Sequence, residues 1–125
     1  LLIAQSERAI ALGLLGRNEE AMADAQQVFD RARQLQPPDP DLIDDAAYSL
    51  SLAHYNNGDL EAAEKVILAA QRPIADGAGI EAERQIDLRN TMGRIYNASG
   101  RHTEALEVRK KIMDWYLRVH GPNYM

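Results

Sequence analysis

The fold is decided by the stretch Gly58-Asp59-Leu60-Glu61-Ala62-Ala63, because two related stretches occur at the same spacing on either side of it. They are Gly16-Arg17-Asn18-Glu19-Glu20-Ala21 and Gly100-Arg101-His102-Thr103-Glu104-Ala105. Each copy begins with glycine and ends with alanine, and both residues recur at the same interval along the chain. Pro38 and Pro122 are separated by twice this interval. Several matches in one register, with a period of about 42 residues, indicate an internal repeat, the signature of an array of stacked structural units.

Each unit is predicted to contain two helices, one on either side of its glycine. Ahead of the second and third glycines, mostly apolar residues recur at helical spacing, at positions 50, 52, 54 and 55 and at positions 92, 95 and 96. Glycine adopts the left-handed conformation just past a helix end without steric cost, so it ends the first helix. The second helix of each unit carries an apolar stripe, formed by Ala21, Ala25, Val28 and Ala32, by Ala63, Val66, Ile67 and Ala70, and by Ala105, Val108, Ile112, Trp115 and Val119.

We expect six helices, at about 1–15, 18–35, 40–57, 60–75, 80–99 and 102–119, and no strand. The segments between the units contain proline and glycine, which end one helical pair before the next begins. Asp39 followed by Pro40 is typical of a helix N-cap with proline in the first turn. The chain from 1 to 125 is therefore predicted to be one repeat domain, with units at about 1–38, 39–80 and 81–122.

The composition is that of a folded chain with an acidic balance. Apolar residues make up 46% and charged residues 26% of the 125 positions, and 14 lysines and arginines stand against 19 aspartates and glutamates, for a formal net charge of −5. This balance argues against nucleic acid as a partner, because nucleic-acid binding needs a basic surface. The absence of cysteine excludes disulfides, thiolate metal sites and a cysteine nucleophile.

The chain begins at Leu1 rather than at a methionine, and we expect it to be a piece of a larger protein. Its opening stretch is apolar but is interrupted by Glu7 and Arg8, whereas a signal peptide needs about 7–15 unbroken apolar residues and a membrane span about 20. We therefore expect no membrane contact by this segment and a cytoplasmic location. The alternative is the extracytoplasmic sensor part of a membrane-anchored parent.

No pattern typical of catalysis, cofactor binding or metal binding is found, and we expect a non-enzymatic protein without a cofactor. The three histidines are far apart and lack a metal-ligand spacing such as HExxH; they are His54, His102 and His120. We interpret His54 as a packed histidine, with a ligand or acid–base role as the alternative. The acidic run from Asp39 to Asp45 does not fit a calcium loop, because isoleucine occupies its fifth position, and is interpreted as carboxylates favoured by a helix N-terminus.

Five positions of each unit share a pattern of residue types. The third unit has Met92-Gly93, Tyr96, Gly100 and Ala105, the second has Leu50-Ser51, His54, Gly58 and Ala63, and the first has Ala9, Leu12, Gly16 and Ala21, with Arg8 where an apolar residue is expected. This pattern resembles the tetratricopeptide repeat, whose usual length is about 34 residues. The longer period, Asn90 and the linker at 119–123 are similar to its kinesin-light-chain-like subtype. The resemblance implies an all-α, right-handed superhelical solenoid of three antiparallel helical hairpins.

The resemblance also implies a protein–protein interaction scaffold within a larger signalling or regulatory protein. In this family the first helices of the units line a concave groove that binds a peptide or a helix, here one with an apolar face. The family register places in this groove Ile10, Leu14, Tyr48, Leu52, Tyr55, Asn90, Arg94 and Asn97. The alternative is that apolar members such as Leu52 only pack between neighbouring helices.

The same register argues against the capture of an acidic C-terminal tail, which some members of the family hold with cationic groove residues. The corresponding positions carry Ser6, Ile10, Ser49, Asp87 and Thr91, none of which is cationic. Asp87 would repel a carboxylate. We therefore expect no binding of such a tail.

The last helix carries apolar residues with no following helix to cover them. Helical spacing turns Ile112, Trp115 and Val119 towards the interior of their own unit. A possible assembly face is formed by Met113, Tyr116 and Leu117. The alternative function is therefore an oligomerisation or structural spacer segment that self-associates through its open terminal helices.

Overall fold

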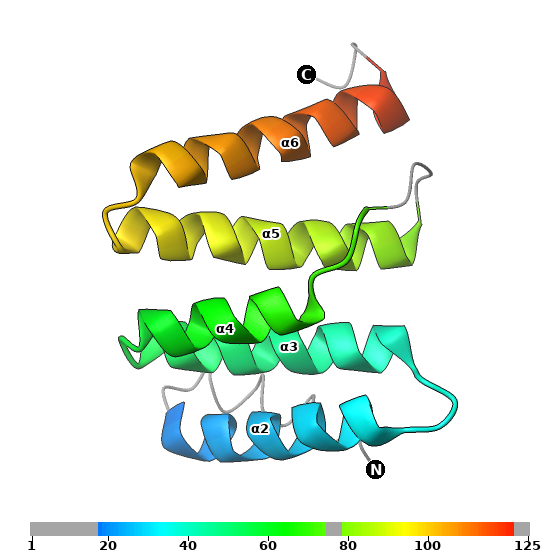
Figure 1. Cartoon of the computed structure of the whole chain (residues 1–125), viewed down its shortest axis with the longest axis vertical. Helices are drawn as coiled ribbons and strands as arrows, with labels where there is room; N and C mark the ends of the chain where they lie inside the picture. The colour runs from blue at the N-terminus through cyan, green and yellow to red at the C-terminus, as the bar shows by residue number, and fades with distance from the viewer. Residues whose placement is uncertain (1–17, 75–78, 122–125) are drawn as a thin grey trace.

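Residues 18–74 and 79–121 are described by the computed structural model, and all regular structure among them is helical. The helices are α2 (Asn18–Gln34), α3 (Pro40–Asn56), α4 (Leu60–Ala70), α5 (Ile80–Ala98) and α6 (His102–His120), shown in Figure 1. Consecutive helices run in opposite directions (Figure 1). The predicted all-α class is confirmed, whereas the helix expected at about 1–15, with Ile10 and Leu14, lies outside the described residues.

The bounds of the helices follow the period of the sequence. The second helices of the units begin at Asn18, Leu60 and His102, which are equally spaced along the chain. The ends of α3 and α5, at Asn56 and Ala98, are separated by the same interval. Four of the five described helices agree with the predicted bounds to within one residue. Their ends are defined by glycine, proline and capping residues, which act on the backbone locally.

Two of the three repeated glycines, Gly58 and Gly100, lie among the described residues, and their turns are built alike. Gly58 and Gly100 have φ angles of 83° and 78°, in the left-handed region. In both turns the N–H of the next residue reaches the carbonyl five residues earlier, from Asp59 to His54 at 2.9 Å and from Arg101 to Tyr96 at 2.8 Å. This hydrogen bond is that of a Schellman-type helix end, in which glycine adopts positive φ without a steric penalty.

The prediction for α4 is wrong at its C-terminus, because the helix ends at Ala70 rather than near residue 75. Gln71 is already extended, with φ −69° and ψ 130°. Pro73 has no N–H and disfavours a helical conformation of the residue before it. The N–H of Arg72 instead donates to Gln85 Oε1 on α5 at 2.8 Å. The linker after α4 is therefore bonded to the next unit.

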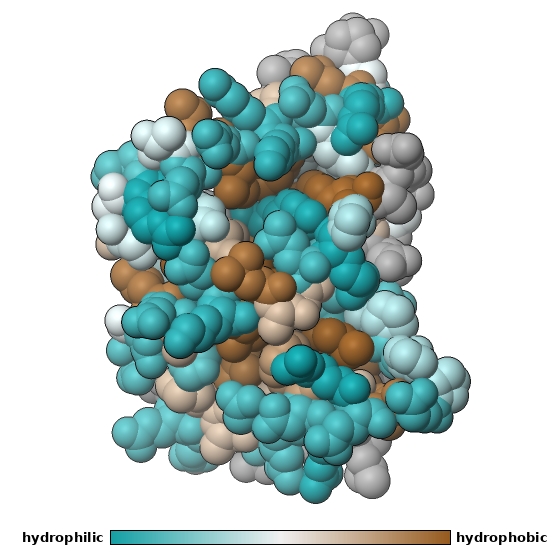
Figure 2. All heavy atoms as spheres, viewed as in Figure 1, coloured by the Kyte–Doolittle hydropathy of each residue, from teal (hydrophilic) through white to brown (hydrophobic). Residues whose placement is uncertain are grey.

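Within residues 18–74 and 79–121, buried side chains form two core clusters, and α5 contributes to both. The larger cluster joins α2, α3 and α4 to Leu88, Met92 and Ile95 of α5. The smaller cluster lies between α5 and α6 and contains Ala82, Ile86, Ile112 and Trp115. α5 also contacts both α3 and α4, so it connects the successive pairs of helices. On the side seen in Figure 2, mostly hydrophilic side chains surround hydrophobic ones that show between α5 and α6.

Replacing Gly100 with alanine is expected to lower the free energy of unfolding by about 1 kcal/mol, because an L-residue is strained at this positive φ. The matched control is Gly93→Ala inside α5, where an added Cβ would lie 3.8 Å from Val108 Cγ1, an ordinary van der Waals contact. Alanine favours a helix over glycine by about 1 kcal/mol, so Gly93→Ala should raise stability. Urea unfolding measures both changes, and changes of the same sign would contradict the assigned turn.

Candidate protein-binding face

A buried polar network fixes α5 against α3. Asp44 of α3 is 1% exposed, and its carboxylate oxygens accept hydrogen bonds from Nη1 and Nη2 of Arg72 at 2.9 and 2.8 Å. Gln85 of α5 is also 1% exposed and donates from Nε2 to Asp44 Oδ1 at 3.1 Å. The two parallel charge-assisted bonds hold the carboxylate and the guanidinium in one geometry. One carboxylate therefore connects α3, the linker after α4, and α5.

The outer part of the same interface is held by Arg84 of α5. Its guanidinium pairs with Asp45, and its Nε lies 3.9 Å from Asp41 Oδ1. The hydrogen bond to Asp45 raises the pKa of Arg84. Asp39 is the N-cap of α3, since its carboxylate accepts from the N–H of Leu42 at 3.2 Å. The interpretation of this acidic run as carboxylates favoured by a helix N-terminus therefore misses its pairing with arginines.

A signal for the buried pair is present in the sequence. Asp44 lies three residues before Ala47 and seven before Ser51, so it belongs to the buried face of α3. A carboxylate at such a position needs a charged or hydrogen-bonding partner. The pattern does not identify Arg72 or Gln85 as these partners, because 28 and 41 residues separate them from Asp44.

The predicted groove residues of α3 and α5 meet at the contact between Tyr55 and Arg94. Tyr48, Leu52 and Tyr55 are half-buried, and both tyrosines pack against the larger core cluster. Across the interface, Arg94 of α5 is exposed, and its guanidinium carbon lies 4.9 Å from the centroid of the Tyr55 ring. This distance is within the range of a cation–π interaction. The two helices therefore share a surface with apolar, aromatic and cationic groups.

Arg94 and Asn90 extend this surface towards α6. Both residues are exposed, and both line a hollow of about 260 Å³ between α5 and α6. The α6 side of the hollow is lined by Val108, Arg109 and Ile112. The surface around Arg94 therefore continues into a hollow that α6 helps to line.

Asn97, the last predicted groove residue of α5, interacts within the protein. It is half-buried, and its Oδ1 lies 3.0 Å from Nδ1 of His102 at the start of α6. Its amide is thus positioned by the turn that follows α5. Asn90 and Arg94 remain the more exposed polar members of the set.

The described positions equivalent to a carboxylate clamp carry no cation. Ser49 and Thr91 are buried, and each hydroxyl donates to the carbonyl four residues earlier at 3.1 Å. Desolvation, together with the nearby charge of Glu83, raises the pKa of the Asp87 carboxyl. The two remaining positions, Ser6 and Ile10, lie outside the described residues. The absence of binding to acidic tails stays a prediction.

The possible assembly face on α6 is divided between exposed and packed residues. Met113 is 40% exposed, whereas Tyr116 and Leu117 are half-buried. Tyr116 packs against the smaller core cluster, with its ring centroid 5.0 Å from that of Trp115 in an edge-on arrangement. Leu106 is 54% exposed and lies seven residues before Met113, so it shares that side of α6, although the sequence pattern does not single it out.

Groups suited to metal binding and membrane-spanning helices are both absent from the described ranges. Within residues 18–74 and 79–121, no three histidine, aspartate or glutamate side chains are arranged to hold a metal ion. No helix in the same ranges has the length and apolar character needed to cross a membrane.

His54 is half-buried, and its Nδ1 has no hydrogen-bond partner. That the chain is not an enzyme stays a prediction.

Comparison of the chain with protein-family models, curated proteins and solved structures gives no match. The resemblance to the tetratricopeptide repeat therefore rests on the repeated residues of this chain.

Replacing Asp44 with asparagine is expected to lower the free energy of unfolding by about 2 kcal/mol, because the buried charge-assisted bonds to Arg72 are weakened or lost. Asp41→Asn is the matched control, since it makes the same change in a carboxylate that is 52% exposed and 3.9 Å from Arg84. This control should lose less than about 1 kcal/mol. Chemical denaturation of the two variants side by side tests the network, and equal losses would contradict it.

Proposed function

We propose that the chain is a non-catalytic protein-binding scaffold of the tetratricopeptide type, part of a larger signalling or regulatory protein. In this proposal its units stack as a right-handed solenoid, and α3 and α5 line the concave side that receives a segment of a partner. Three observations support it: the equal spacing of the helix starts, the two alike turns, and the contact between α3 and α5. A helical hairpin cannot bury its apolar face alone, so stacked units provide the common core.

The observation that carries the proposal is the contact of Arg94 with the ring of Tyr55 across α3 and α5. It brings together two residues from successive units, and among the described residues Arg94 is exposed and Tyr55 is half-buried. Half-buried tyrosines and an exposed arginine are the residue types that most often contribute binding energy at protein interfaces. The surface therefore suits a segment with apolar side chains whose backbone carbonyl oxygens accept hydrogen bonds from Arg94 and Asn90.

Peptides selected by display against the chain should bind this face. Arg94→Gln is expected to weaken the selected peptides by about tenfold, because it removes both the charge and the guanidinium donors at the centre of the face. Lys65→Gln on α4 is the matched control, since it removes one charge from a side chain that is 75% exposed and distant in the sequence. The control should change affinity by less than about twofold. Calorimetry gives the dissociation constants.

Hydrogen exchange of the complex provides an independent measurement of the binding position. The proposal predicts slower exchange of amides in α3 and α5 when the peptide is bound. Selected peptides whose affinity is the same for wild type and Arg94→Gln, with protection confined to other helices, would contradict the proposal.

The alternative function, assembly through the terminal helix, is favoured by the exposure of Leu106 and Met113 on one side of α6. Exposed apolar residues that share a helix face are typical of an interaction surface. Tyr116 and Leu117 add less to such a surface than the sequence suggests, because both are half-buried.

If this alternative operates, sedimentation equilibrium should show an average mass that rises with protein concentration. The double variant Leu106→Ser with Met113→Ser should then stay monomeric. Leu68→Ser on α4 is the control, because Leu68 is 55% exposed but lies on another helix. A wild-type chain that stays monomeric at every concentration would exclude assembly through α6.

A further inference from the structure

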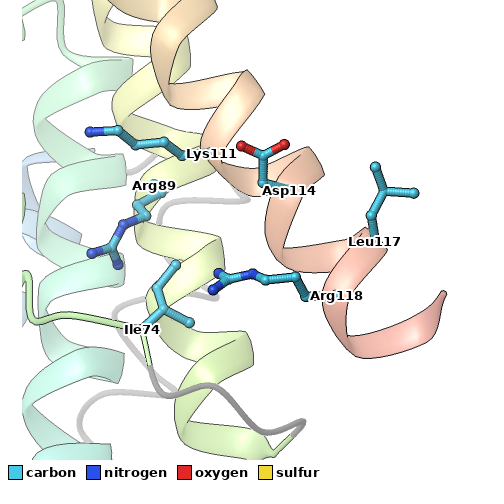
Figure 3. A pocket seen from close by; sticks show the side chains of 6 residues that line it. All are labelled: Ile74, Arg89, Lys111, Asp114, Leu117 and Arg118. Carbon is cyan, nitrogen blue, oxygen red and sulfur yellow. The ribbon is translucent and has the colours of Figure 1, made fainter. Parts of the chain in front are cut away.

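A hollow with an excess of cationic side chains lies between α6, α5 and the linker after α4. Its volume is about 640 Å³, and it is lined by Ile74, Arg89, Lys111, Asp114, Leu117 and Arg118 (Figure 3). Three of these residues are cationic, one is anionic and two are aliphatic. The hollow is largely open to solvent, and its volume lies in the range of roughly 300–1,000 Å³ that is usual for small-molecule sites.

Arg89 is the central cation of this hollow. Its Nη2 donates to the carbonyl oxygen of Arg72 at 2.7 Å, and its Nη1 donates to Gln85 Oε1 at 3.2 Å. Both acceptors are neutral, and no carboxylate among the described residues forms an ion pair with Arg89. Burial lowers the pKa of this guanidinium. A partly desolvated cation without a counter-charge favours the binding of an anion.

The two other cationic residues of the hollow, Lys111 and Arg118, lie on α6. Lys111 and Arg118 are seven residues apart, which places them on the same side of the helix. In Figure 3 the Arg118 side chain extends from α6 towards Ile74. Lys111 and Arg89 also line a second hollow of about 220 Å³ on α4, α5 and α6. The two hollows therefore share these two cationic residues.

We propose that the larger hollow binds a small organic anion, whose carboxylate or phosphate group lies against Arg89 and Lys111 and whose apolar part contacts Ile74 or Leu117. The guanidinium supplies donors in a fixed plane, and the flexible ammonium adds a second positive charge. Apolar contact with Ile74 or Leu117, which lie apart in Figure 3, distinguishes such a ligand from a bare inorganic ion. Arg89 also lines the hollow of about 260 Å³ that Arg94 and Asn90 line, so this site adjoins the proposed protein-binding face.

Titration with phenyl phosphate and with benzoate, followed by NMR chemical shifts of the backbone amides, tests the proposal. We expect saturable shifts around residues 89, 111 and 117, with a dissociation constant in the range of about 1 mM. Lys111→Gln should weaken binding by about fivefold, because it removes one of the charges that face the anion. Lys110→Gln removes the same charge from the neighbouring exposed residue, which does not line the hollow, and should change binding by less than about twofold.

The arms of the experiment also identify the anionic group. Tighter binding of phenyl phosphate assigns a phosphate ligand, and tighter binding of benzoate assigns a carboxylate; either result supports the site. Benzyl alcohol, which lacks the charge, should not bind. Absence of saturable shifts with both anions, or equal weakening by Lys110→Gln and Lys111→Gln, would overturn the proposal, since the latter result is that of unspecific surface charge.

Discussion

The buried carboxylate of Asp44 is the constraint on which the position of α5 against α3 depends. A carboxylate that is 1% exposed has lost its hydration and must find both a positive charge and hydrogen-bond donors within the protein. Arg72 supplies the charge and Gln85 a further donor. The end of α4, the course of its linker and the register of α5 are therefore coupled through the hydrogen bonds around this carboxylate. Apolar packing alone would be less restrictive, because it is not directional.

The network around Asp44 also connects the two surfaces for which we propose functions. Gln85 contacts Asp44 on one side and accepts a hydrogen bond from Arg89 on the other. Arg89 then faces the hollow between α5 and α6, whereas Arg94 lies over Tyr55 on α3. α5 thus contributes to a proposed protein-binding face and to a proposed anion site. Because its position is fixed by directional bonds, the residues of both surfaces are held in a defined arrangement before any partner binds.

The helix boundaries could largely be predicted from the sequence, because glycine, proline and apolar spacing act locally. Pro73 marks the early end of α4, and the apolar stripe likewise stops at Ala70, so the expected extension to about residue 75 overlooked a local signal. That Tyr55 and Arg94 lie on one side of the protein could be predicted from the repeat register, because the register aligns the first helices of successive units. The partners of Asp44 could not be predicted, since no periodicity relates a helix residue to an arginine in a linker 28 positions later. The packing of Tyr116 against the smaller core likewise depends on how α6 lies on α5.

The central claim is that the pairing of Asp44 with Arg72 holds α5 against α3. A double-mutant cycle tests it most directly, with Asp44→Asn, Arg72→Gln and the combined variant compared by chemical denaturation. A directly coupled buried pair predicts an interaction free energy of about 1.5 kcal/mol or more between the two substitutions. Additive losses, with an interaction free energy near zero, would contradict the claim and show that apolar packing alone positions α5.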